Sequence, residues 1–270
     1  MSDRVKKPVL IRENTEISQG IFSMWLEANE IASQSGPGQF ISMYTKDASK
    51  LLPRPISICD YNKNDGLLRV VYRVSGEGTK QFSGYKAGET IDVLGPLGNG
   101  YDVEKLASYG KEKPAVLMVV GGGIGIPPML GLIKAYKTQY PDAKVIAVLG
   151  YRNLDTFLDD EFKDYAEVYY ASDDGSIGIK GNVIDAIMAE GLVADVICAC
   201  GPTPMLRGLK AYCTEVCAPL YISLEEKMAC GIGACLACVC KSKEVDHHSH
   251  VHNKRICKDG PVFNAEEIEL

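Results

Sequence analysis

The spacing of the cysteines near the C-terminus constrains this chain more than any other feature of its sequence. Cys230, Cys235 and Cys238 read Cys-x4-Cys-x2-Cys, and Cys240 and Cys257 follow. Plant-type [2Fe–2S] clusters take three thiolate ligands at this spacing and a fourth from further along the chain, which makes Cys257 the natural fourth ligand. Glycines between the cysteines suit a loop that wraps closely around a compact anionic group. We therefore predict a cluster site and expect Cys240 to be a bystander; the alternative is that Cys240 replaces Cys238 or Cys257 as a ligand.

Two other interpretations of these cysteines remain open. Four thiolates also suit a tetrahedral zinc ion, although zinc loops usually offer paired Cys-x2-Cys motifs and this segment has one. Cysteines can also pack as small apolar residues, which explains their density in this segment less well. Histidines are ligands in Rieske-type sites, but a solvated loop is the simpler interpretation of His247, His248, His250 and His252. The remaining cysteines are interpreted as packing residues: Cys59, Cys198, Cys200, Cys213 and Cys217.

Composition narrows the class of protein. The chain has 270 residues, and 29 Lys and Arg against 35 Asp and Glu give a net charge of −6, which argues against nucleic-acid and anionic-membrane surfaces. With 46% hydrophobic and 24% charged residues, the chain is expected to fold. The charge-free run 114–133 contains glycines and prolines in its middle, so a strand, a turn and a helix explain it better than a membrane span. The polar N-terminus shows no signal peptide, and we expect a cytoplasmic protein with reduced cysteines.

The first hundred residues read as short strands separated by turns. Segments rich in Val, Ile, Leu and Tyr are separated by Gly, Pro, Asn and Asp, and they span residues 9–17, 21–28, 39–45, 55–61, 67–74 and 89–94. Six strands at this spacing, with one helical segment near 79–85, predict a small antiparallel β-barrel. We assign this barrel to residues 1–104.

The pattern changes after residue 114. Apolar, strand-like runs alternate with helix-like segments; the runs span 115–120, 144–149, 168–171 and 196–199, and the helices 127–140 and 182–189. Such alternation predicts an α/β domain in which crossover helices connect the strands of a parallel sheet. We assign it to residues 105–220. Residues 221–270, rich in glycine and cysteine, are expected to form a small cluster-binding arm.

Two loops of the expected parallel sheet are candidate nucleotide-binding segments. The glycine loop from Gly121 to Gly125 follows a buried strand and opens a helix, so backbone amides are accessible to a phosphate. It reads Gly-x-Gly-x-x-Pro where dinucleotide-binding loops usually end in a third glycine, and a simple tight turn is the alternative. Cys200-Gly201-Pro202 follows a second apolar strand. Two such strand ends would form a crevice at one edge of the sheet.

The expected barrel carries a motif of its own. Arg54 lies between two prolines at a strand start, and its guanidinium suits a diphosphate. Ser57 offers a hydroxyl to the edge of a flat ring. Val71-Tyr72-Arg73 and the turn at 76–79 add an aromatic ring, a second arginine and a helix start. Each of these features, taken singly, also fits an ordinary surface or strand position.

In combination the motifs resemble the ferredoxin–NADP reductase superfamily. The motifs occur in the order typical of that superfamily: Arg54-Pro55-Ile56-Ser57, the Gly-x-Gly-Thr turn at 76–79, Gly95-Pro96-Leu97-Gly98-Asn99-Gly100, the glycine loop and Cys200-Gly201-Pro202. Residues 225–235 and 255–263 narrow the match to the electron-transfer subunits of type B dihydroorotate dehydrogenases, which the chain resembles over essentially its whole length. Some related subunits have Asp in place of the first cysteine, so Cys230 favours this family.

The resemblance implies three cofactor sites and no catalytic acid or base on this chain. FAD is expected in the barrel, at Arg54, Pro55, Ile56, Ser57, Val71, Tyr72, Arg73, Gly78 and Thr79. NAD is expected in the second domain, at Gly122, Gly123, Gly125, Cys200, Gly201 and Pro202. The cluster ligands correspond to Cys230, Cys235, Cys238 and Cys257.

The resemblance also implies a partner and a route for electrons. NAD⁺ accepts a hydride and a [2Fe–2S] cluster carries one electron at a time, so a flavin has to stand between them. The expected route runs from an FMN-containing dihydroorotate dehydrogenase catalytic subunit through the cluster and FAD to NAD⁺, in a heterotetramer of two plus two subunits that serves pyrimidine biosynthesis. Alternatives are a reductase of another flavin and iron–sulfur complex, or a zinc module without redox function. Arg152 suits the 2′-phosphate of NADP, and Asp155 suits a free ribose hydroxyl.

Overall fold

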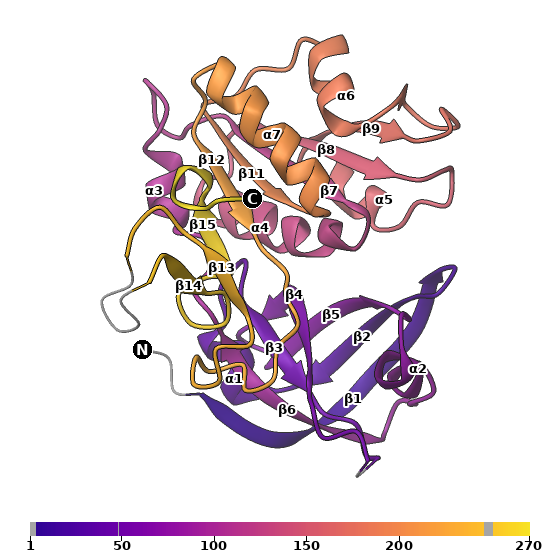
Figure 1. Cartoon of the computed structure of the whole chain (residues 1–270). Coiled ribbons are helices and arrows are strands. Elements are labelled where there is room, and N and C mark those ends of the chain that lie inside the picture. The colour runs from indigo at the N-terminus through magenta and orange to yellow at the C-terminus, as the bar shows by residue number, and fades with distance from the viewer. Residues whose placement is uncertain (1–3, 48, 246–250) are drawn as a thin grey trace. The chain divides into compact units, whose positions relative to one another are not determined.

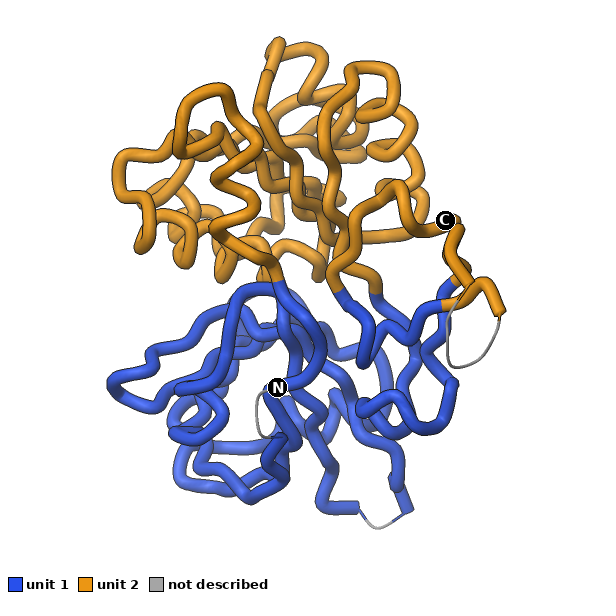
Figure 2. The backbone as a smooth tube through the Cα atoms, turned by 90° about the vertical axis from the view of Figure 1, so that its left-hand side faces the viewer, with its two compact units in different colours: residues 1–100, 225–240, 254–261 blue, residues 101–224, 241–253, 262–270 orange. Residues whose placement is uncertain are grey.

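The computed structural model describes residues 4–47, 49–245 and 251–270. Figure 2 shows two compact units: unit 1 comprises residues 1–100, 225–240 and 254–261, and unit 2 comprises residues 101–224, 241–253 and 262–270. The C-terminal residues are thus divided between the units, and the three-part division expected from the sequence stays a prediction. Of the histidine insert, His247, His248 and His250 lie outside the described residues.

Unit 1 is the predicted six-stranded antiparallel barrel (Figure 1). Its strands close in the order β1-β2-β5-β4-β3-β6. Their bounds are β1 (Val5–Ser18), β2 (Ile21–Glu27), β3 (Phe40–Met43), β4 (Arg54–Asn62), β5 (Leu67–Arg73) and β6 (Thr90–Leu97). Two short helices lie in the connections, α1 (Asn29–Gln34) and α2 (Glu77–Ser83). The sequence predicted the second of these helices.

Alternation along the strands decides which side chains fill the barrel. Ile41 and Met43 of β3 belong to the buried core, together with Ile58 of β4. Because successive side chains of a strand point to opposite faces, Phe40 and Ser42 lie on the outer face of β3. The register places Ser42 opposite Pro55 on β4 and Leu94 on β6.

Unit 2 is built on a seven-stranded sheet of order β10-β9-β8-β7-β11-β12-β15. Its parallel strands are β7 (Leu117–Gly122), β8 (Val145–Tyr151), β9 (Glu167–Ser172), β10 (Ile179–Lys180), β11 (Val196–Cys200) and β12 (Leu220–Ser223). The parallel arrangement confirms the prediction, and of these strands β10 and β12 were not predicted. The seventh, β15 (Val262–Asn264), pairs antiparallel with β12 and comes from the C-terminal residues. All six residues of β7 are buried, as expected of a strand covered on both faces.

The described residues of unit 2 also form the helices α3 (Val103–Ala107), α4 (Ile126–Gln139), α5 (Asp159–Lys163), α6 (Val183–Ala189) and α7 (Thr203–Glu215). Single 3₁₀ turns occupy Gly123–Gly125 and Ala265–Glu267. Two further strands, β13 (Val239–Lys241) and β14 (Asn253–Arg255), pair with each other beside the cysteines. Among the described residues, no helix combines the length and the apolarity needed to span a bilayer.

Candidate cofactor sites

The segment from Cys230 to Cys238 forms a tight loop in unit 1. Gly231, Gly233 and Leu236 have φ angles of +68°, +85° and +58°, the left-handed region that glycine enters without steric cost. The resulting bends turn backbone amides toward the first cysteine, because the amides at positions 232 and 234 donate to Cys230 Sγ at 3.5 and 3.3 Å. The loop therefore has the backbone conformation that the glycines predict for the wrapping of an anionic group.

The four predicted ligands form two pairs. Cys235 is a neighbour of Cys230 that lowers its pKa, and Cys238 is a neighbour of Cys257 that raises its pKa. The Cys257 amide also donates to Cys238 Sγ at 3.4 Å. Within the described residues, no three His, Cys, Asp or Glu side chains surround a single ion position. Two pairs of thiolates fit the two irons of a [2Fe–2S] cluster better than one tetrahedral zinc ion.

Burial and backbone donors shift the thiol pKa values in opposite directions. Burial raises the pKa of Cys230, but the amides at positions 232, 234 and 235 outweigh it and lower this pKa to about 6. Burial, together with the neighbouring Cys238 and Cys230 thiols, raises the pKa of Cys257 to about 12. Cysteine ligates iron as the thiolate. The positive charge of bound iron would therefore have to ionise the Cys257 thiol.

The turn that carries the fourth predicted ligand is closed by an ion pair. Arg255 donates to the Asp259 carboxylate from its backbone amide at 2.7 Å, from Nε at 3.1 Å and from Nη2 at 3.3 Å. The Ile256 amide donates to the Cys238 carbonyl at 2.9 Å. Because Cys257 lies inside this turn, its sulfur is held against Cys238.

The glycine-rich segment after β6 anchors the same turn, a role that the sequence analysis missed. Asn99 Nδ2 donates to the carbonyls of Lys258 and Asp259 at 2.9 and 3.2 Å, and the Asn99 amide donates to the Gly260 carbonyl at 2.6 Å. A Cβ on Gly98 would lie 2.6 Å from Pro261 Cδ. The one sequence signal for this contact was an asparagine between two glycines.

The other cysteines lie outside the two pairs. Cys240 Sγ donates to the Lys254 carbonyl at 3.5 Å between β13 and β14, and burial raises its pKa to about 11. Its place outside the ligand set stays a prediction. Cys59, Cys198, Cys200 and Cys213 are buried as packing requires, but Cys217 is exposed, so its interpretation as a packing residue was wrong. All ten cysteines are described, and none forms a disulfide.

In the barrel, the structure brings Arg54 to the first turn of α2. A Cβ on Gly78 would lie 2.0 Å from Arg54 Nε and 2.4 Å from Cζ, so the guanidinium lies directly against the glycine backbone. Thr79 Oγ1 accepts hydrogen bonds from the amides of Ser75 and Gly76 at 2.9 and 3.2 Å, which fixes the turn. An arginine fork beside helix amides is a donor set suited to the diphosphate of FAD.

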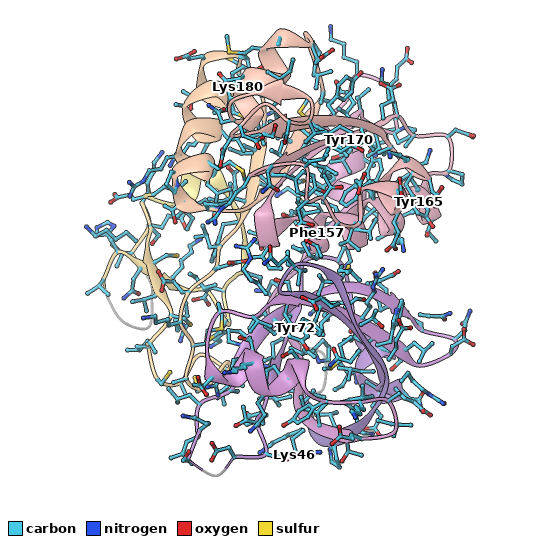
Figure 3. All side chains as sticks on the ribbon, turned by 90° about the vertical axis from the view of Figure 1, so that its right-hand side faces the viewer. Lys46, Tyr72, Phe157, Tyr165, Tyr170 and Lys180 are labelled. Atoms are coloured by element: carbon cyan, nitrogen blue, oxygen red, sulfur yellow. The ribbon has the colours of Figure 1, made fainter. Side chains whose placement is uncertain are left out.

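The remaining barrel residues that are expected to bind FAD differ in their exposure to solvent. Pro55, Ile56 and Ser57 are half-buried, Val71 is buried and Arg73 is exposed. Tyr72, labelled in Figure 3, is 1% exposed within the barrel core, and its hydroxyl donates to Asn14 Oδ1 at 3.1 Å. The Tyr72 ring is therefore not available to stack on a ligand, and only its backbone remains for one.

Glycines at the two ends of α2 test whether Arg54 and the first turn of this helix bind FAD. Gly78→Ala is expected to weaken FAD binding about 5- to 150-fold, because the added methyl group would push the Arg54 guanidinium away from the proposed diphosphate site, a loss of about 1–3 kcal/mol. Gly84→Ala at the helix C-terminus is the matched control: its Cβ would meet no atom closer than 3.5 Å, and FAD affinity is expected to stay unchanged. Fluorescence titration of the flavin-free chain measures both, and equal losses in the two variants would contradict the assignment.

In unit 2, the structure brings the two predicted nucleotide loops together. β7 and β11 are parallel neighbours, so their carboxyl ends deliver both loops to one edge of the sheet. A Cβ on Gly125 would lie 2.3 Å from the Cys200 carbonyl oxygen, and a Cβ on Gly201 would lie 3.1 Å from the Gly122 amide nitrogen. Gly123 has a φ of +53°. The loops therefore meet backbone to backbone at the sheet edge where the sequence predicts a crevice.

Two helices begin at this edge of the sheet. α4 starts at Ile126, with Pro127 and Pro128 in its first turn, and α7 starts at Thr203 after the exposed Pro202. In both helices, which are fully described, no side chain caps the N-terminus. Their first amides remain as donors for the diphosphate of NAD. The thiol of the strand-end cysteine, Cys200, is 0% exposed, so this residue presents backbone rather than sulfur.

Known proteins match these sites. Residues 225–269 match the iron–sulfur cluster binding domain of dihydroorotate dehydrogenase B, and residues 119–211 match the oxidoreductase NAD-binding domain. The solved NADH-dependent reduced ferredoxin-NADP oxidoreductase superposes with a TM-score of 0.84 at 29% identity, covering 97% of this chain and 89% of that one.

Two curated relatives carry one name, dihydroorotate dehydrogenase B (NAD(+)), electron transfer subunit. The relative from Fusobacterium nucleatum is 43% identical over 266 residues, which cover 96% of this chain and 97% of the relative. The relative from Bacillus velezensis is 42% identical over 267 residues, which cover 98% and 99%. Identity at this level over nearly the full length, with the matched cluster and NAD-binding domains, shows that the chain belongs to the family of dihydroorotate dehydrogenase B electron transfer subunits.

Proposed function

We propose that this chain is the subunit that passes electrons from a dihydroorotate-oxidising partner to NAD⁺ in pyrimidine biosynthesis. The observation that carries the proposal is the arrangement of the four cysteines as two pairs, Cys230 with Cys235 and Cys238 with Cys257, in the same unit as an arginine-lined helix start. When bound, the [2Fe–2S] cluster supplies one-electron transfer and FAD exchanges one electron with it and two with NAD⁺.

The residues of the chain hold these groups in place. The two cysteine pairs ligate the irons, and the amides of the cluster loop donate to Cys230. Arg54 and the first turn of α2 bind the FAD diphosphate, and the amides at the starts of α4 and α7 bind that of NAD. Each group is thus bound by thiolates, backbone amides and one guanidinium, and no side chain is assigned as a general acid or base.

The surface of the cluster loop supports docking of the partner there. Ile232, Leu236 and Val239 are 40%, 49% and 38% exposed, and Cys235 is exposed among them. An exposed apolar patch of this kind marks an interaction surface, and electron transfer to the cluster requires the partner to come close. The proposed partner is the FMN-containing catalytic subunit, in a heterotetramer of two plus two. A reducing, cytoplasmic location belongs to the same proposal, because ten cysteines form no disulfide.

A chain purified anaerobically without its partner tests the proposal. We expect a flavin band and about two irons and two sulfides per chain, bleaching by NADH, and NADH oxidation by artificial acceptors. Dihydroorotate is expected to be oxidised only after the catalytic subunit is added. Zinc in place of iron, or dihydroorotate turnover by the chain alone, would overturn the proposal.

A reductase subunit of another flavin and iron–sulfur complex is the second candidate. The similarity to the NADH-dependent reduced ferredoxin-NADP oxidoreductase supports it, but at 29% identity against 43% for the dihydroorotate dehydrogenase B subunit. Arg152 and Asp155 are both exposed after β8, and steady-state rates with NADH and NADPH decide which of them governs the choice of nucleotide.

A further inference from the structure

One buried hydroxyl beneath the cluster loop has no hydrogen-bond partner among the described residues. Ser42 of β3 is 0% exposed, and its Oγ makes no hydrogen bond. The side chain points out of the barrel, because Ile41 and Met43 on either side of it fill the interior. A Cβ built on Gly231 would lie 3.0 Å from Ser42 Oγ. The hydroxyl therefore lies against the backbone of the residue that follows Cys230.

The two cross-strand neighbours of this hydroxyl are apolar. The strand neighbours of Ser42 are Pro55 and Leu94, whose side chains neither donate nor accept hydrogen bonds. Tyr44 lies on the same side of the chain two residues later, and burial, Asp92 and Cys230 raise its pKa. This side of β3 thus faces Cys230, and a buried hydroxyl normally has a partner.

We propose that Ser42 donates its hydroxyl hydrogen to a sulfur of the loaded cluster on the Cys230 side, and that it thereby raises the reduction potential of the cluster. This inference rests on the proposed function, because it requires the cluster. Reduction adds a negative charge to the cluster, so a donor stabilises the reduced form more than the oxidised form. The amides of the loop already donate to Cys230, and Ser42 adds a donor from the barrel.

Potentiometric titration followed by electron paramagnetic resonance tests the proposal on the full chain. In Ser42→Ala we expect unchanged iron and FAD contents and an equilibrium constant for cluster reduction about tenfold lower, which is about 59 mV for a one-electron couple. Ser42→Thr keeps the hydroxyl and is expected to keep the wild-type potential. Ser35→Ala is the matched control: Ser35 is 1% exposed and donates to the Ile31 carbonyl at 2.8 Å within unit 1, and its loss is expected to leave the potential unchanged.

The outcomes separate this inference from the proposed function. A wild-type chain without iron contradicts the proposed function itself. A wild-type chain with iron, and Ser42→Ala with full iron and an unchanged potential, overturns only the role of Ser42. If Ser42→Ala does not bind iron, Ser42→Thr decides: a wild-type potential supports the donor, and a tenfold loss in the reduction constant despite the retained hydroxyl overturns it.

Discussion

Cys257→Ala is expected to abolish assembly of the [2Fe–2S] cluster, whereas Cys240→Ala is expected to leave it intact. Cys257 is fully buried and pairs with Cys238, inside a turn that the Arg255–Asp259 ion pair closes. Cys240 is not expected to take its place, because its sulfur donates to the Lys254 carbonyl between β13 and β14. Iron and acid-labile sulfide assays, with visible circular dichroism, measure the result.

FAD content is the internal control for this pair of variants. Arg54 and the first turn of α2 are unaffected by either substitution, so both variants are expected to retain flavin and to be reduced by NADH. A Cys240→Ala chain that lacks iron, or a Cys257→Ala chain with about two irons, would show that Cys257 is not the fourth ligand of the cluster.

Gly125→Ala is expected to weaken NADH binding about 5- to 150-fold, and Gly122→Ala only a few-fold. The two glycines belong to one loop, but their added methyl groups would meet different neighbours. On Gly125 the Cβ would lie 2.3 Å from the carbonyl oxygen of Cys200 and 2.5 Å from its carbon, a backbone that cannot move away. On Gly122 it would lie 2.6 Å from Met205 Sδ, the end of a flexible side chain. Overpacking against a fixed neighbour costs about 1–3 kcal/mol.

NADH-dependent reduction of an artificial acceptor measures this difference, with iron and flavin contents as the check that unit 1 is intact. The weaker binding is expected to appear as a higher Michaelis constant for NADH. Equal affinity in the two variants would mean that the contact between the two loops does not shape the nucleotide site.

Local sequence patterns predicted those parts of the fold that local interactions determine. The strand expected at 67–74 is Leu67–Arg73, and the helix expected at 127–140 is Ile126–Gln139. The helix Asn29–Gln34 was not predicted, because it has six residues and no side-chain cap to mark its start. The strand Val262–Asn264 was also not predicted, because its three residues gain their conformation from pairing with β12.

The same distinction holds at the candidate sites. The spacing Cys-x4-Cys-x2-Cys is local, and it brings Cys230, Cys235 and Cys238 into one loop, whereas the place of Cys257 beside Cys238 depends on the fold. The role of Asn99 depends on carbonyls 159 and 160 positions away, so nothing near it in the sequence reveals the contact. Tyr72 was assigned from a motif, but the alternation of the strand turns its ring into the barrel. A sequence motif can identify residues near a site, but the direction in which each side chain points follows only from the folded structure.

The chain leaves unit 1 at Gly100, returns to it at Glu225, and crosses between the units again before it ends in unit 2. Neither unit is therefore encoded by one continuous segment of the gene. An exchange of the NAD-binding unit between two relatives has to include β15, which lies beyond all the cluster cysteines. Recombination at a single point near residue 100 would leave the barrel of one parent without its own residues 225–240 and 254–261, which would come with the sheet of the other parent. Inheritance in this family is therefore expected to favour whole genes over exchanged halves.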